Sequence, residues 1–244
     1  MTTAMDTPLI QEFGPDIYFV DGPDVNFVGF PYPTRMVLIA LQDGGVLMWS
    51  PIPYSDNLWE EMRECNLSNV RHVVSPNKIH HLFLKEWQEK CLEAKFYSPP
   101  GLPKRSVAQG IRFDHALEND KAMEFTNEVK HVVFGGSSIM EEVMFYHLKS
   151  KTCIVGDLIQ RHPEESVRAN GWKGMILKLD GLAGKKGSTP REWRLSFLFG
   201  KKKARAAKAT VLEEWKPENL IIAHGLCVND GTATKVMEKA LKWI

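Results

Sequence analysis

The first part of the chain alternates short apolar runs with polar breaks, a pattern typical of β-strands. The runs DIYFVDG, VNFVGF, RMVLIAL and GVLMWSP follow one another, and DGG between the last two indicates a hairpin. We therefore expect short antiparallel strands at the start of the chain.

Helical periodicity appears next, in two segments that flank a predicted buried strand, VRHVVSP. SDNLWEEMREC begins with Ser55 or Asp56 as N-cap, and HHLFLKEWQEKC places apolar residues on one face from His80 onward. KFYSPPGLPKR then predicts a strand that a proline and glycine cluster ends.

The second half repeats this order of strands followed by helices. Strands are predicted in IRFDHAL, MEFTNEVKHVVFGG, EEVMFYHLKSKTCIVGDLI and ENLIIAHG, and a helix in NDGTATKVMEKALKWI. A less regular, basic region covers about residues 161–208. No solenoid repeat or long linker divides the chain, so we expect one domain over residues 1–244, of α/β or α+β class, with sheets in the middle and helices outside.

The composition of the chain limits the kinds of partner that it is expected to bind. Lys and Arg total 31 against 30 for Asp and Glu, so no global field favours nucleic acid or an anionic membrane. No apolar run approaches the roughly 20 residues of a membrane span. The N-terminus lacks the pattern of a secretory signal, and the 4 cysteines are far apart. A cytoplasmic protein with reduced thiols is expected.

Chemically capable side chains stand where predicted strands end. His80 and His81 follow VRHVV, Asp157 ends KTCIVGD, and His224 ends NLIIAH. Rigid strands often place ligands and catalytic groups at such ends, so these residues are candidates for one metal site. The alternative is turn chemistry, with His80 or Asn77 only satisfying free N–H groups at a helix start.

The strand, His-rich loop and helix, followed by KTCIVGDLI and LIIAHG, resemble the metallo-β-lactamase-like hydrolase superfamily over about residues 10–244. The words PNKIHH, EEVMFYH and AHG are most similar to a branch known only as a domain of unknown function. The resemblance implies a four-layer αββα sandwich with a metal site at one edge of its two sheets.

The superfamily's first motif, His-x-His-x-Asp-His, corresponds here to PNKIHH. His81 falls on the last histidine and His80 replaces the aspartate, while Pro76 and Lys78 stand at the two earlier histidine positions. Half of this motif is therefore missing.

The next family histidine falls at Ser137 or Ser138 of GGSSIMEE, whereas Asp157 matches the bridging aspartate and His224 the final histidine. The resemblance thus implies that one metal position is lost. It also implies that the other is kept by His80, His81, Asp157 and His224. Such ligands suit one divalent ion, Zn²⁺ or Fe²⁺.

Two further features bear on chemistry. Glu141 and His147 share one parity of the strand EEVMFYH, so Glu141 is a candidate general base or added ligand, unless the strand is a solvated edge. Asp157 is the other candidate for the catalytic base. Lys185, Lys186 and Arg191 of AGKKGSTPR are candidates for holding an anionic substrate.

Three functions remain open. The first is a metal-dependent hydrolase of a small ester, lactone or thioester, with a metal-bound water as nucleophile. The second is an iron-dependent oxidoreductase, and the third is a non-catalytic binding protein. The basic stretch GKKKARAAK, with Trp193 and Phe199 nearby, also suits RNA. Lysine runs are more often a solvated helix face, so nucleic acid is not the expected partner.

Overall fold

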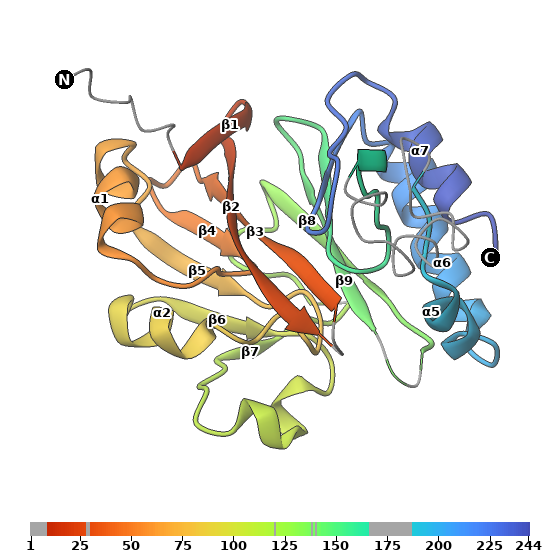
Figure 1. The fold of residues 1–244 in the computed structure, drawn as a ribbon, viewed down its shortest axis with the longest axis horizontal. Coiled ribbons are helices and arrows are strands. Elements are labelled where there is room, and N and C mark those ends of the chain that lie inside the picture. The colour runs from red at the N-terminus through yellow and green to blue at the C-terminus, as the bar shows by residue number, and fades with distance from the viewer. Residues whose placement is uncertain (1–8, 28–29, 120, 138, 140, 166–186) are drawn as a thin grey trace.

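Two β-sheets pack face to face at the centre of the molecule, and helices cover the outer face of each (Figure 1). The computed structural model describes residues 9–27, 30–119, 121–137, 139, 141–165 and 187–244. These four layers confirm the predicted mixed αββα sandwich.

The larger sheet has seven strands in the order β1-β2-β3-β4-β5-β6-β7. Its first four strands are antiparallel to their neighbours, whereas β4 to β7 run parallel. The strands are β1 (Ile10–Gly14), β2 (Ile17–Phe27), β3 (Phe30–Ala40), β4 (Val46–Trp49), β5 (Val70–Val74), β6 (Lys95–Ser98) and β7 (His115–Ala116).

The smaller sheet has four strands in the order β11-β10-β9-β8. They are β8 (Val129–Phe134), β9 (Glu142–His147), β10 (Thr152–Val155) and β11 (Asn219–Ile222). Because β10 and β11 are parallel, their carboxyl ends lie side by side, which places the residues after them at one edge of the sheet.

Helices α1 (Asp56–Glu64) and α2 (Leu84–Lys90) cover the larger sheet. On the smaller sheet lie α5 (Arg191–Ser196), α6 (Lys201–Ala209), a π-helical turn η3 (Thr210–Trp215) and α7 (Ala233–Ala240). Two short 3-10 turns, η1 (Leu102–Lys104) and η2 (Ser106–Ala108), follow β6. Within the described residues, no helix combines the length and apolar character that crossing a bilayer requires.

Apolar side chains fill the three spaces between the four layers. Alternation along β9 shows the principle: Val143 and Phe145 enter the core between the sheets, while Met144 and Tyr146 pack toward the helices. The core between the sheets joins residues from both halves of the chain, such as Val37 and Ile221.

Several predicted elements differ in extent. The helix expected from His80 begins at Leu84, because residues 80–83 form a turn. The strand IRFDHAL shortens to β7. By contrast, α1 begins as predicted, with the Ser55 hydroxyl accepting the Leu58 N–H at 3.2 Å.

The basic region is more regular than its sequence indicated. The stretch KKKARAAKA forms α6, and Ala204 and Ala207 bury one face of that helix against the smaller sheet. Ala204 and Ala207 lie three positions apart and so give α6 an apolar face, although most of its other residues are basic. Lys185 and Lys186 lie outside the described residues, and Arg191 begins α5 as an exposed side chain.

Buried His147, at the end of β9, is expected to make folding stability depend on pH. Burial lowers the pKa of His147 from 6.5 to about 4. Between these values the unfolded chain binds a proton that the folded protein does not. Stability from this group is therefore complete above pH 6.5 and is lost as the pH falls toward 4.

Urea unfolding of wild type and His147→Gln at about pH 7.5 and about pH 5 measures this effect. From pH 7.5 to pH 5, the free energy of unfolding of wild type should fall by about 2 kcal/mol more than that of the variant. The reason is a slope of roughly 1.4 kcal/mol per pH unit below the pKa of the unfolded state. Equal losses in both proteins would show that His147 is not held neutral.

Candidate metal centre

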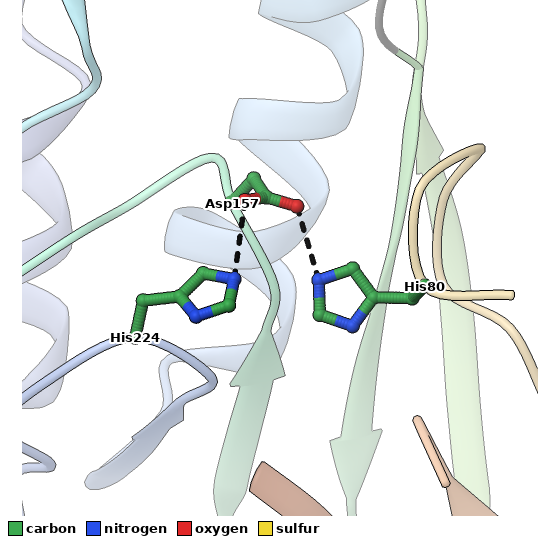
Figure 2. Close-up of side chains that lie close together, drawn as sticks. All are labelled: His80, Asp157 and His224. Atoms are coloured by element: carbon green, nitrogen blue, oxygen red, sulfur yellow. Dashed lines mark hydrogen bonds and ion pairs between the residues drawn. The ribbon is translucent and has the colours of Figure 1, made fainter. Parts of the chain in front are cut away.

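The side chains of His80, Asp157 and His224 converge at one edge of the two sheets (Figure 2). His80 Nε2 lies 3.0 Å from Asp157 Oδ2, and His224 Nε2 lies 3.2 Å from Asp157 Oδ1. One ligand atom from each residue lies within 4.8 Å of the others. The three residues follow β5, β10 and β11, so carboxyl ends of strands from both sheets build the site.

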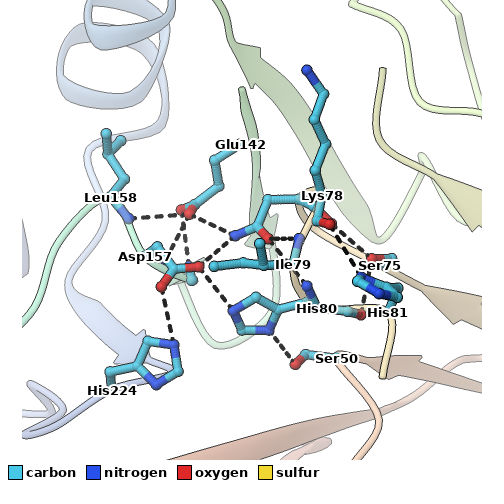
Figure 3. Close-up of polar contacts among 12 residues, drawn as sticks. Ser50, Ser75, Lys78, Ile79, His80, His81, Glu142, Asp157, Leu158 and His224 are labelled. Carbon is cyan, nitrogen blue, oxygen red and sulfur yellow. Dashed lines mark hydrogen bonds and ion pairs between the residues drawn. The ribbon is translucent and has the colours of Figure 1, made fainter. Parts of the chain in front are cut away.

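The loop after β5 holds His80 by its own polar groups (Figure 3). The Asn77 side-chain oxygen accepts the N–H groups of Ile79 and His80 at 3.0 and 3.2 Å. The Ser75 hydroxyl shares its one hydrogen between the carbonyl oxygens of Asn77 and His80, at 3.0 and 2.9 Å. These bonds fold residues 75–80 into a compact turn that aims the His80 ring at Asp157.

Ser50 supports His80 from the other side of the ring. Its hydroxyl lies 2.6 Å from His80 Nδ1, and Trp49 places its ring 5.9 Å from the imidazole. Ser50 adopts φ +52°, a left-handed conformation that costs free energy for a residue with a Cβ. Ser50 follows β4 directly, and its strained backbone places the Ser50 hydroxyl in contact with His80.

A second, fully buried carboxylate fixes the backbone around Asp157. Glu142 Oε2 accepts the N–H groups of Asp157 and Leu158 at 2.6 and 3.0 Å, and Oε1 accepts that of Gly156 at 2.9 Å. Asn77 Nδ2 bridges the two acids, 2.7 Å from Asp157 Oδ2 and 3.3 Å from Glu142 Oε2. Figure 3 shows this connected network behind Asp157.

The outer nitrogen of His224 is fixed as a donor. His224 Nδ1 lies 2.7 Å from the carbonyl oxygen of Pro33, which can only accept. Nδ1 therefore carries a hydrogen, and Nε2 is the nitrogen directed at Asp157. Tyr32 packs edge-on against the ring at 5.3 Å, which limits its rotation.

The electrostatics of the site favour a negative charge on Asp157 and a positive charge on His224. Burial alone would raise the pKa of Asp157, but His224 and His80 outweigh it and hold that pKa well below its usual range. Burial would likewise lower the pKa of His224, but the Asp157 carboxylate raises it above 6.5. Burial raises the pKa of Glu142 to about 7, with the nearby Asp157 charge acting in the same direction.

This donor set fits a divalent transition metal. Two imidazole nitrogens and one carboxylate are ligands that Zn²⁺ and Fe²⁺ accept, and three protein ligands leave a coordination position open. Both histidines direct Nε2 inward while Nδ1 contacts an oxygen of the protein, the arrangement that orients metal-binding imidazoles. Without a metal, His224 must carry protons on both nitrogens to hydrogen-bond both Pro33 and Asp157.

His81 does not join this group. Its Nδ1 lies 3.1 Å from the carbonyl oxygen of Lys78, within the same turn, and burial lowers its pKa. Because residues 80–83 form a turn, the two neighbouring imidazoles point to different partners. The structure thus brings together three of the four predicted ligands, and His81 lies outside that group.

Glu141 also lies outside the three-residue group. Its carboxylate accepts the Gly136 N–H at 3.3 Å, whereas the adjacent Glu142 lies behind Asp157. Ser137, at a position matching a family histidine, bonds instead to the Ser196 hydroxyl at 2.6 Å. Ser138 lies outside the described residues.

Sequence reasoning missed the supporting residues Ser50 and Glu142, and it gave Asn77 only a capping role. An acidic pair at the start of an otherwise apolar strand was the available signal for Glu142, since an unpaired buried carboxylate is costly. Nothing in the sequence marked Ser50, whose role depends on a left-handed backbone.

Asn77→Leu is expected to weaken metal binding by about 10- to 100-fold, the usual effect of losing a group that orients a ligand. The substitution keeps the side-chain volume but removes the donor to Asp157 and the acceptor for the His80 loop. Zinc titration calorimetry measures the change. Asn69→Leu, at an exposed asparagine that bonds Gly44, is the control. Unchanged affinity in Asn77→Leu would show that the network does not position the ligands.

Comparison with solved structures defines the fold as that of the metallo-β-lactamases. A metallo-β-lactamase from Pontibacter korlensis is 13% identical with a TM-score of 0.60, covering 96% of this chain and 97% of the other. FIM-1 from Pseudomonas aeruginosa, in its mono-zinc form, is 12% identical with a TM-score of 0.62, covering 98% and 96%. The enzyme from Hirschia baltica is 10% identical with a TM-score of 0.62, covering 96% of each chain.

Within this fold, the chain belongs to the family described as Domain of unknown function (DUF4336), whose sequence profile matches residues 24–191. This match covers Asn77, His80, Glu142 and Asp157 but ends before His224. The search of curated proteins gave no match.

Proposed function

We propose that this protein is a metal-dependent hydrolase that binds one divalent ion through His80, Asp157 and His224. The observation that carries the proposal is the convergence of their ligand atoms within 4.8 Å, with both imidazoles oriented by contacts at Nδ1. One of the similar structures, FIM-1, was solved in a mono-zinc form, which supports the use of this fold with a single ion.

When bound, the metal supplies a water molecule whose pKa falls toward 7, which makes hydroxide available at neutral pH. Asp157 is the only carboxylate of the three-residue group. Its two oxygens face one histidine each, so Asp157 would help to hold the ion and is the candidate to take a proton from the attacking water. Glu142 and Asn77 hold Asp157 in place for this role.

We infer a small substrate with a carbonyl centre, such as an ester, lactone or thioester. A screen of these classes, together with phosphodiesters, tests the proposal on zinc-loaded and iron-loaded protein. His224→Ala should abolish turnover. Glu141→Ala should leave it within a few-fold, since that residue lies outside the group; loss of about 10² to 10⁴-fold would restore Glu141 as the general base. Full activity in His224→Ala would reject the mechanism.

A second function, iron-dependent oxidation, is favoured by one observation. Two histidines and one carboxylate are also the ligand set of non-haem Fe²⁺ oxygenases. Oxygen consumption by the iron-loaded protein, with no hydrolysis under anaerobic conditions, would select this function over the first.

We also propose that the protein works in the cytoplasm, with a small-molecule substrate rather than a nucleic acid. Its four cysteines, Cys65, Cys91, Cys153 and Cys227, are free thiols, which supports a reducing compartment. Fractionation of cells that express the protein tests this placement.

A further inference from the structure

Large apolar side chains project into solvent where α5 turns into α6. Leu195 is 64% exposed, Leu198 56% and Phe199 fully exposed. Leu198 donates its N–H to the Leu195 carbonyl, so the two side chains lie one turn apart. Figure 1 shows α5 at the lower right corner of the helical layer, at the periphery of the molecule.

This corner is firmly anchored from beneath. Phe197 is buried and packs against Phe134 of β8 and Trp243 near the C-terminus, with ring centroids 5.6 and 5.4 Å away. Gly200 and Gly136 approach so closely that a Cβ on Gly200 would lie 1.8 Å from the Gly136 carbonyl oxygen. The turn that exposes Leu198 and Phe199 is therefore tightly packed against the rest of the protein.

Ile139 adds an apolar side chain from a different segment. It is 63% exposed, and its N–H donates to the Ser137 hydroxyl at 3.1 Å. That hydroxyl bonds in turn to Ser196 at the end of α5. Two hydrogen bonds thus tie Ile139 to α5, and we call Ile139, Leu195, Leu198 and Phe199 the apolar corner.

Positive charge adjoins the apolar corner directly. Lys201, Lys202 and Lys203 open α6, and Lys202 and Lys203 are exposed, while Ala204 and Ala207 face the core. Across the part of the chain that the structure describes, no ion pair or hydrogen bond is recorded for these three ammonium groups. The described residues thus place a cluster of three lysines, two of them exposed, directly beside the apolar corner.

We propose that the apolar corner and Lys201–Lys203 together dock onto an anionic lipid surface. Exposed apolar side chains next to a basic helix face are what an interfacial membrane contact requires, because the first enter the headgroup region and the second meet lipid phosphates. The near-neutral net charge of +1 gave no such indication, since the basic face is local.

Two other occupants fit this surface less well. A symmetric contact between two copies would bring the lysines of both chains together, and like charges oppose such an interface. Single-stranded RNA would use aromatic stacking, but three of the four apolar residues here are aliphatic and Phe199 is the only ring. Anionic lipid satisfies both parts of the surface.

Vesicle sedimentation with the full chain tests the docking. Wild type should bind vesicles of equimolar phosphatidylcholine and phosphatidylglycerol, and bind pure phosphatidylcholine far more weakly. Lys202→Gln with Lys203→Gln should weaken binding by about 30-fold, since each lysine near an anionic surface contributes about fivefold. Leu198→Ser with Phe199→Ser should weaken it by at least about tenfold.

Matched controls remove similar groups elsewhere. Leu92→Ser replaces a leucine that is 69% exposed beyond α2, and Lys85→Gln with Lys104→Gln removes two exposed lysines; both should bind vesicles as wild type does. All these positions are on the surface, and circular dichroism confirms that each variant folds.

Three results would overturn the proposal. The first is absence of binding by wild type to the anionic vesicles, and the second is equal binding by the corner variants and the controls. The third is a concentration-dependent dimer, or binding of a single-stranded RNA, that is lost in the corner variants while vesicle binding is not. That outcome would assign the surface to a second copy or to nucleic acid.

Discussion

His80→Ala is expected to weaken zinc binding by roughly a thousandfold, while the neighbouring substitution His81→Ala leaves it within about twofold. Zinc sites in proteins are worth about 10 to 16 kcal/mol, and one ligand of three or four carries a corresponding share of that free energy. His80 Nε2 points at Asp157, whereas His81 bonds to the Lys78 carbonyl. Titration calorimetry with metal-free protein measures both affinities.

The two substitutions are matched in chemistry, in sequence position and in the turn they occupy. His81→Ala therefore controls for damage to the loop after β5. If both variants lost zinc equally, His81 would be a fourth ligand, as the sequence predicts.

Glu142→Ala is expected to destabilise the fold by about 3 to 9 kcal/mol, because each of three unsatisfied buried donors costs about 1 to 3 kcal/mol. The substitution leaves the N–H groups of Gly156, Asp157 and Leu158 without their acceptor. Glu141→Ala removes one bond of 3.3 Å to Gly136 from a half-buried side chain, so it should cost less than about 1 kcal/mol.

Urea unfolding of the metal-free variants measures these costs. Metal-free protein is used because a bound ion adds its own stabilisation to the folded state. Similar stabilities for the two variants would show that Glu142 does not cap the turn that carries Asp157.

The sequence predicted the layers of the fold and three residues of the site for a definite physical reason. Apolar periodicity identifies strands, and residues that follow strand ends often form sites, so the sequence and its family resemblance grouped His80, His81, Asp157 and His224. The structure brings three of these four residues together. Their role as metal ligands stays a prediction.

The choice between neighbours could not be made in the same way. His80 and His81 are separated by a turn that replaces the expected first turn of α2, and Glu142 begins β9 whereas Glu141 lies just before it. A strand's register determines which face each residue occupies, and one residue's shift exchanges the two faces. Ser50 and Asn77 act through contacts between distant segments, which periodicity does not encode.

Elemental analysis of protein purified without an affinity tag tests the central claim most directly. The account predicts one zinc or iron per chain in wild type and in His81→Ala, and a loss of that metal in His80→Ala and His224→Ala. Wild type that purifies without metal and fails to take up either ion in titration would contradict it, and would leave His80, Asp157 and His224 as a hydrogen-bonded triad in a non-catalytic binding protein.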